Sequence, residues 1–310
     1  MNSKHRLLFA AILLVATGGR AVSIETALFA ASQSAPQPAT RAMTVRPVRL
    51  REVRGRGLLA DVWVNAVGPF TFAVDTGAGA TLVSTRTATA ARLDVRSNRS
   101  RSIAGLSGRG TIAHDANIQS LAIGDRTNYA PGLRSVVVTP ALPSDIDGVL
   151  DPTEAFSPLG YIIDIPGLEL STFDSRALPL RLEEQPREGA VVRWLREGSS
   201  HRPFVQLDNG DRALLDTGSS LGLGIRSHSE PGRGRVSYSR DIGGGQVSSE
   251  RVRPMTVAIG ALKLRNVPTD VISGAEAGAP TLLGLSALRP FRLVFDPLNR
   301  LIEIAPASRG

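Results

Sequence analysis

Short apolar segments separated by Gly, Pro, Asn and Asp follow one another from about residue 44 onwards. Such a series is typical of β-strands, and it predicts an all-β fold. Residues 58–75 resemble two strands joined by a turn at Val67-Gly68-Pro69. Residues 203–216 show the same arrangement, with a turn at Asn209-Gly210, which is a strong signal for a hairpin.

Both predicted hairpins end in the same triplet, Asp-Thr-Gly, at Asp75 and at Asp216. A Gly-rich stretch follows each triplet, with Gly105 placed 30 residues after its aspartate and Gly244 placed 28 residues after its own.

Two further segments recur in the same order: residues 147–152 correspond to 281–286, and residues 161–170 correspond to 292–304. Four features in one order predict a tandem duplication with a boundary near residues 181–189. We therefore expect an N-terminal lobe over residues 48–182 and a C-terminal lobe over residues 188–307.

The two aspartates suggest a shared chemical site. In a pseudo-symmetric pair of lobes, equivalent loops can meet and place two carboxylates together. Two carboxyl groups in contact cannot both be ionised, because their negative charges repel. One group can therefore act as a general base and the other as an acid. A water held between them then becomes a nucleophile toward a peptide carbonyl.

The residues beside the aspartates suit this arrangement. Gly77 and Gly218 allow the backbone to turn tightly beneath the carboxylates. Thr76 and Thr217 carry hydroxyls able to form hydrogen bonds across the interface between the lobes.

Together these motifs resemble the aspartic proteases, and more narrowly the retropepsin-like branch, fused in tandem over residues 48–307. The resemblance implies two pseudo-symmetric β-barrel lobes with the active site at their interface. It implies an aspartic endopeptidase that hydrolyses an extended peptide or protein substrate, without a cofactor or metal. It also implies that the Gly-rich stretches are flaps, for which the candidates are Gly105, Gly108, Gly243 and Gly244. Both aspartates lie in one chain, so the site should form within one chain.

The sequence departs from the family pattern at one position. The pattern has two apolar residues and a glycine beneath each catalytic loop, as in Leu282-Leu283-Gly284, but the first lobe has Asp151 in place of the glycine. Asp151 stands where little room is expected, so either the loop is modified or activity is lost. The alternative to an enzyme is a catalytically inactive peptide-binding protein of the same fold.

The two loops also differ three residues after each aspartate, where Ala78 corresponds to Ser219. A serine hydroxyl that donates to a carboxylate favours its charged form, and alanine cannot donate. We therefore expect Asp216 to be the ionised partner and Asp75 the protonated one.

Composition narrows the classes of function. The chain has no cysteine, which excludes disulfides, thiolate catalysis and cysteine-based metal sites. The net charge is +8, but the arginines are scattered without interleaved aromatic residues, so nucleic-acid binding is not expected.

The N-terminus indicates export. Lys4, His5 and Arg6 precede an apolar run at residues 7–17, which is typical of a signal peptide. We expect a signal over residues 1–21, which could extend to about residue 35, and a linker or pro-segment over residues 36–47. The protein would be periplasmic or secreted, with no membrane contact beyond this segment; an uncleaved anchor is the alternative.

Three other motifs are weaker. Ser220 stands at the centre of a Gly-x-Ser-x-Gly match, but its surroundings are β-like and a serine hydrolase is not expected. The acidic residues Asp145, Asp147 and Asp151 lack the ligand order of a calcium loop. The separate histidines, His114, His201 and His228, do not form a metal motif.

Overall fold

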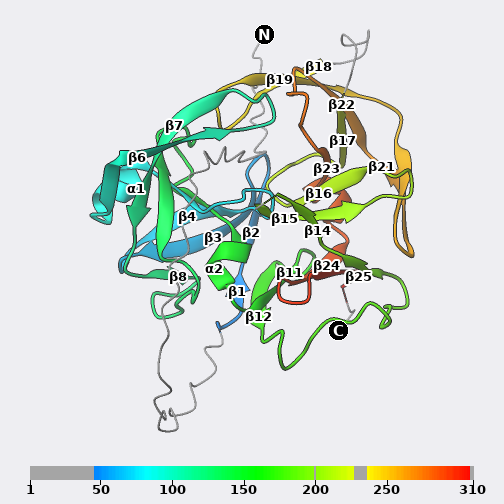
Figure 1. Cartoon of the computed structure of the whole chain (residues 1–310), viewed down its shortest axis with the longest axis horizontal. Coiled ribbons are helices and arrows are strands. Elements are labelled where there is room, and N and C mark those ends of the chain that lie inside the picture. Colours follow the sequence, from blue (N-terminus) through cyan, green and yellow to red (C-terminus); the bar gives the residue numbers. More distant parts are fainter. Residues whose placement is uncertain (1–44, 199, 227–235, 308–310) are drawn as a thin grey trace, which may run out of the picture.

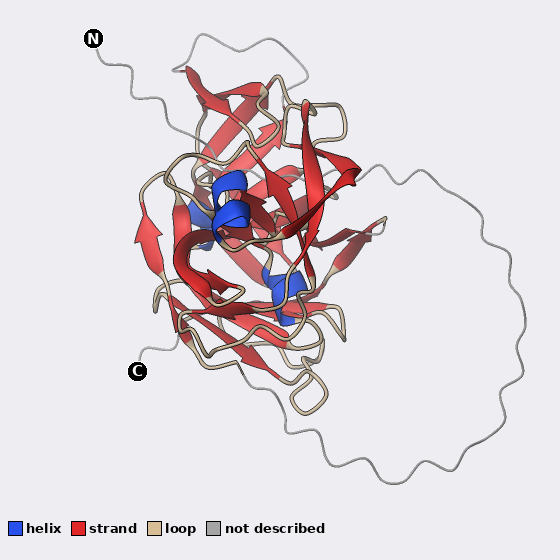
Figure 2. Cartoon of the chain, turned by 90° about the vertical axis from the view of Figure 1, so that its left-hand side faces the viewer, coloured by secondary structure: helices blue, strands red, loops and turns tan. Residues whose placement is uncertain are grey.

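The computed structural model describes residues 45–198, 200–226 and 236–307. The predicted signal segment and His228 lie outside these residues, as does all but the end of the predicted linker. Strands dominate the described chain, which confirms the all-β prediction (Figure 2). Three short helices accompany them: α1 (Thr85–Ala90), α2 (Pro152–Phe156) and α3 (Leu285–Leu288).

Residues 48–182, the range expected for the first lobe, contain a large sheet with the order β2-β3-β4-β10-β5-β9-β7-β6, and β8 pairs with β3. Its strands are β2 (Arg51–Val53), β3 (Gly57–Val64), β4 (Val67–Val74), β5 (Leu82–Ser84), β6 (Asp94–Ala104), β7 (Gly110–Asn117), β8 (Leu121–Ile123), β9 (Ser135–Thr139) and β10 (Gly148–Leu150).

The second lobe (residues 188–307) contains a sheet with the order β14-β15-β16-β23-β17-β22-β19-β18. Its strands are β14 (Leu195–Glu197), β15 (Ser200–Gln206), β16 (Arg212–Asp216), β17 (Leu223–Arg226), β18 (Val236–Arg240), β19 (Gln246–Arg251), β22 (Thr269–Ser273) and β23 (Thr281–Gly284). A separate pair consists of β20 (Met255–Ile259) and β21 (Leu262–Val267).

The eight-strand orders of the two lobes match strand for strand. Each pairing also has the same direction in both lobes: β4 is parallel to β10 as β16 is to β23, and β5 is parallel to β9 as β17 is to β22. This correspondence is what a tandem duplication implies, although the duplication itself stays a prediction. Among the described strands no sheet closes on itself, so each lobe is built on an open sheet and not on the closed barrel expected from the sequence. The flap hairpin at one edge of each sheet, β6–β7 or β18–β19, pairs with its own sheet on one side only.

A six-stranded sheet joins the lobes at the base of the molecule as drawn in Figure 1. Its strands are β1 (Val48–Arg49), β12 (Glu169–Phe173), β11 (Gly160–Asp164), β24 (Phe291–Asp296), β25 (Leu301–Pro306) and β13 (Ala190–Arg193). The equivalent strands β11 and β24 pair with each other at its centre, where Tyr161 stacks on Phe295 with ring centroids 4.6 Å apart. One buried apolar cluster runs from this sheet into both lobes.

The first hairpin turn was predicted at the wrong place. Val67, Gly68 and Pro69 lie within β4, and the turn is formed by Asn65 and Ala66. Both turn residues are left-handed, with φ of 50° and 63°, as a two-residue hairpin turn requires. Asn65 tolerates this conformation, and its Oδ1 accepts a hydrogen bond from Gln119 N at 2.8 Å.

Within the described ranges, no helix is both long enough and apolar enough to cross a bilayer.

Candidate active site

The two Asp-Thr-Gly loops lie at the ends of the central strands β4 and β16. The three residues before each aspartate are buried and apolar, and each strand lies parallel to a neighbouring strand, β10 or β23. The fold therefore brings Asp75 and Asp216 to the interface of the lobes. Their side chains are 1% and 0% exposed.

Reciprocal hydrogen bonds between Thr76 and Thr217 hold the two loops together. The hydroxyl of Thr76 accepts from Thr217 N at 3.1 Å and donates to Leu215 O at 2.6 Å. In return, the hydroxyl of Thr217 accepts from Thr76 N at 3.1 Å and donates to Val74 O at 2.9 Å. Each threonine thus satisfies buried backbone groups of the opposite lobe, where an unpaired group would cost about 1–3 kcal/mol.

The glycines of the two loops lie against the opposite aspartate. A Cβ on Gly218 would stand 2.3 Å from Cγ of Asp75, and one on Gly77 would stand 2.8 Å from Cγ of Asp216. Glycine is therefore required because the partner's carboxyl group fills the space. Gly77 N also donates to Oδ1 of Asp75 at 2.8 Å.

The surroundings make the two acids different. Burial raises the pKa of Asp75 well above its usual value, and the negative charge of Asp216 raises it further. Burial also raises the pKa of Asp216, to about 6, but a hydrogen bond from Asp75 and the N–H groups of Ser219 and Gly218 oppose that rise. The pair titrates as a unit in which the first proton to leave comes from the Asp216 side.

The reason that the sequence suggested for this difference was wrong. The group of Ser219 that donates to Oδ1 of Asp216 is its backbone N–H, at 2.9 Å, and not its hydroxyl. The hydroxyl oxygen instead accepts a long bond from Leu221 N at 3.4 Å. The hydroxyl of Ser219 therefore does not separate the two acids. Their backbone donors do differ, because Ala78 N donates to the main-chain oxygen of Asp75, at 3.4 Å, and not to its carboxyl group.

Asp151 stands where the second lobe has Gly284, and the backbone N–H at this position has a different partner in each lobe. In the second lobe, Gly284 N donates to Gly222 O at 2.8 Å, and a Cβ on Gly284 would lie 2.6 Å from Leu221 O. In the first lobe, Asp151 N donates instead to the hydroxyl of Thr81, at 3.1 Å. A contact between backbone and side chain replaces one between two backbones, and this makes room for the carboxyl group.

The Asp151 side chain caps the N-terminus of the helix α2. Its Oδ1 accepts from Thr153 N at 2.8 Å, so it is the N-cap that Gly284 cannot supply for α3. The group is 2% exposed, and burial, followed by the charge of Glu154, raises its pKa to about 8. Asp151 therefore belongs to a modified loop, in which its side chain has a structural role as the N-cap of α2.

The flap candidates lie at the tips of two hairpins, β6–β7 and β18–β19, which Figure 1 shows at the opposite end of the molecule from β11 and β24. Gly108 and Gly244 are both left-handed, with φ of 71° and 79°, and both are the fourth residue of a five-residue tip. Gly108 is therefore the equivalent of Gly244, and the sequence pairing of Gly105 with Gly244 was wrong. The strands of the first hairpin are longer, so its tip lies more residues after the aspartate than the tip of the second hairpin does.

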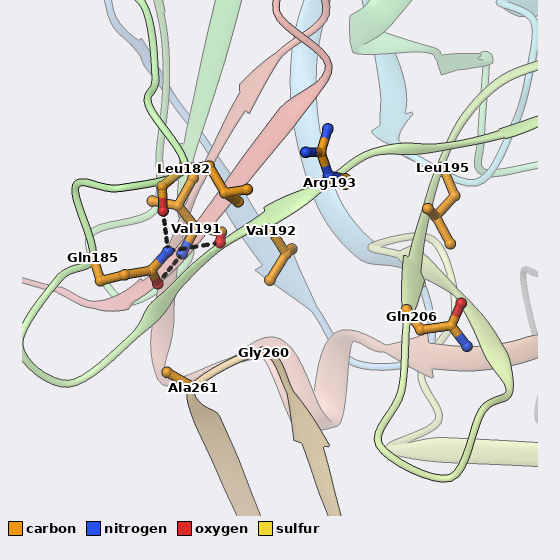
Figure 3. Close-up of a pocket in the computed structure, with 9 residues that line it drawn as sticks. All are labelled: Leu182, Gln185, Val191, Val192, Arg193, Leu195, Gln206, Gly260 and Ala261. Atoms are coloured by element: carbon orange, nitrogen blue, oxygen red, sulfur yellow. Dashed lines mark hydrogen bonds between the residues drawn. The ribbon is translucent and has the colours of Figure 1, made fainter.

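A cavity of about 400 Å³ lies away from the aspartates, at the connection between the lobes (Figure 3). Gln185 points from this connection toward β13, where it donates to Val191 O at 3.0 Å and accepts from Val191 N at 2.9 Å. The side chain pairs with β13 as a neighbouring strand would. The cavity therefore belongs to the joint between the lobes.

In the described residues, the three weaker motifs do not lie in an arrangement that would form a catalytic or metal-binding site. Ser220 lies in the loop between the strands β16 and β17, without a following helix. Asp145 and Asp147 pair with Arg56 and Arg86 on the surface. No group of three or more potential metal-ligating side chains occurs in the described part of the chain.

Two buried charged residues, one beside Asp216 and one in a flap tip, were not found from the sequence. Arg202 is 4% exposed, forms an ion pair with Glu197, and lowers the pKa of Asp216 by its charge. Asp241 lies in the tip of the second flap and is 7% exposed. Each is a single charged residue in an ordinary strand or turn, so no local pattern distinguishes it.

Comparison with known proteins finds a similarity to a known family within the first lobe. Residues 60–146 match the family model described as gag-polyprotein putative aspartyl protease. This segment is therefore similar to the aspartyl proteases. The match includes Asp75 and the first flap hairpin, and it supports a protease, hence a hydrolase, as the general class of function. It ends before β10 and does not extend to Asp216. Among curated proteins, none matches the chain.

Proposed function

We propose that the protein is an aspartic endopeptidase in which Asp75 and Asp216 share a catalytic water. The observation that carries the proposal is the pairing of two buried carboxyl groups, from equivalent loops, with unequal proton affinity. Apart from the Asp75 carboxyl, no described group donates to Oδ2 of Asp216. The pair therefore offers one base and one acid at the same place.

The chemistry follows from these protonation states. Ionised Asp216 accepts a proton from the water as its oxygen attacks the peptide carbonyl carbon. Protonated Asp75 donates its proton to the carbonyl oxygen, which gives a neutral tetrahedral diol. Asp216 then gives its proton to the peptide nitrogen, and Asp75 takes a proton from a hydroxyl of the diol as the C–N bond breaks. The products are a carboxylic acid and an amine, and both carboxyl groups return to their first state.

The substrate would be an extended peptide or protein segment between the lobes and beneath the flaps. One chain supplies both acids, so a monomer would suffice. We also retain the export of the protein, to the periplasm or the medium, as part of the proposal.

Cleavage of a peptide library at pH 4–7 tests the mechanism. The wild type should cleave, and Asp75→Asn and Asp216→Asn should each reduce kcat by at least about 10³-fold, because each removes the base or the acid. Asp208→Asn, in the turn of the hairpin that leads to Asp216, is the matched control and should retain activity. Cleavage that survives both active-site substitutions would contradict the mechanism.

A peptide-binding protein without turnover is the second candidate. The near-complete burial of Asp75 and Asp216 favours it, because an occluded pair cannot reach a carbonyl. Binding of library peptides by the wild type without cleavage would select this function.

A further inference from the structure

The tips of the two flaps are equivalent loops that touch each other. The first tip comprises residues 105–109 and the second comprises residues 241–245, each between the strands of its hairpin. With Gly108 matched to Gly244, the first residues of the tips, Gly105 and Asp241, occupy equivalent positions. A Cβ on Gly105 would lie 2.4 Å from both Cβ and Cγ of Asp241. The side chain of one tip therefore fills the space that the glycine of the other leaves open.

The carboxylate of Asp241 binds both tips. Its Oδ2 accepts from Ser107 N of the first tip at 2.7 Å, and its Oδ1 accepts from Gly245 N of its own tip at 3.0 Å. Among the described residues no Lys or Arg side chain forms an ion pair with Asp241, so backbone N–H groups are its partners. Hydrogen bonds to a buried charged acceptor are about twice as strong as neutral ones.

Each tip also inserts an apolar side chain into the opposite lobe. Leu106, from the first flap, is 1% exposed and belongs to a buried cluster of the second lobe that includes Leu221 and Leu282. Ile242, from the second flap, is 6% exposed and belongs to a cluster of the first lobe that includes Ala78. Glu276 N of the second lobe donates to Leu106 O at 2.9 Å.

We propose that Asp241 is a positioning residue that joins both flaps into one lid, closed over the Asp75–Asp216 pair until a substrate separates the tips. This inference deepens the proposed function and rests on it for the role of the covered pair. The unequal tips have a physical reason: one carboxylate can accept from both tips, whereas two equivalent carboxylates would repel each other at the contact. The lid also accounts for the burial of both acids.

Amide hydrogen exchange tests the contact without requiring activity. Asn at position 241 keeps the shape but supplies one acceptor oxygen and an NH₂ group, so one of the two hydrogen bonds is lost. In Asp241→Asn, the amide that loses its acceptor, Ser107 or Gly245, should exchange about tenfold faster or more than in the wild type. The matched control is Asp94→Asn, at an exposed position where the first flap begins, and it should change the exchange of neither amide. Unchanged exchange in a folded Asp241→Asn variant would overturn the proposal.

A reversible cross-link tests whether the lid must open. A Cβ on Gly245 would lie 2.6 Å from Cβ of Ser107, so the tips must move apart by about 1 Å to reach the Cβ separation of a disulfide, and the chain has no cysteine to compete. In the Ser107→Cys/Gly245→Cys variant, oxidation should abolish cleavage of a peptide that the wild type cleaves, and reduction should restore it. The single-cysteine variants should not respond to oxidant.

The outcomes separate the two proposals. Full activity of the cross-linked form, with the disulfide verified by mass, would overturn the lid. Failure of the wild type to cleave any peptide would instead count against the proposed function, and the exchange experiment would still decide whether Asp241 holds the tips together.

Discussion

At the level of single residues, the two proposed catalytic acids differ first in their hydrogen bonds, and a smaller contribution comes from a charged residue on the neighbouring strand. The register of β15 with β16 pairs Phe204 with Leu214, which places Arg202 opposite Asp216. The corresponding register of β3 with β4 places Gly57 opposite Asp75. A buried cation thus stands beside only one of the two carboxyl groups, and it favours the charged form of Asp216.

Replacing this cation should alter the pH dependence of catalysis. In Arg202→Met, the pKa of Asp216 should rise, so the acid limb of the pH profile of kcat/KM should move to higher pH. Arg202→Lys should keep the acid limb at its wild-type pH, because it retains the positive charge. Ser219→Ala should also leave the acid limb unmoved, because the serine donates to Asp216 through its backbone N–H. Kinetics between pH 3 and 8 measure this. An unmoved limb in Arg202→Met, or a shift in Ser219→Ala, would contradict the assignment.

At the level of elements, the segment after β10 shows how a helix cap can replace a glycine. The carboxyl group of Asp151 caps α2, and its own N–H donates to the Thr81 side chain. Glu154, in the first turn of α2, accepts from Thr81 N at 2.8 Å, so it ties the loop of Thr81 to the helix. The departure from the family pattern is therefore accommodated by a linked set of local changes.

The stability of this element should depend on pH. The folded pKa of Asp151 is raised from 3.8 to about 8, so the folded state keeps a proton that the unfolded chain loses above pH 4. Stability should therefore fall between pH 4 and 8. Asp151→Asn removes this contribution and should flatten the decline by up to about 1.4 kcal/mol per pH unit.

Denaturant unfolding of the wild type and of Asp151→Asn at each pH from 4 to 8 measures the free energy of unfolding that this prediction concerns. Glu183→Gln, at an exposed position, is the control and should follow the wild type. Parallel curves for wild type and Asp151→Asn would show that the carboxyl group does not hold the proton.

At the level of the whole molecule, the lobes form one folding unit. The central pair β11–β24 and the shared apolar cluster connect them, and the threonine bonds and the flap tips add contacts between equivalent residues. Separation of the lobes would expose the apolar strands of the six-stranded sheet, so the two halves should unfold together.

The two tryptophans can report on the lobes separately. Trp63 lies in β3 of the first lobe, and Trp194 lies between β13 and β14 of the second. Trp194→Phe and Trp63→Phe leave one reporter each, and both variants should give urea midpoints by fluorescence that coincide with their own circular dichroism. Fluorescence and circular dichroism midpoints that differ within one variant would contradict a single cooperative unit.

Much of this protein was predictable from local sequence. The alternating apolar pattern indicated strands, and the repeated triplet indicated which carboxylates to compare, because side-chain period and turn chemistry are properties of neighbouring residues. The hairpin at Asn209-Gly210 and the correspondence of 161–170 with 292–304 were predicted for the same reason.

Other features were decided only by the tertiary structure. The donor to Asp216 is a backbone group, room for Asp151 comes from Thr81, and the partner of Gly105 is Asp241. The bonds that hold the two loops and the two flaps together join residues 141 and 134 positions apart. Such contacts depend on how two distant loops meet, and the residues on either side of each loop do not encode that meeting.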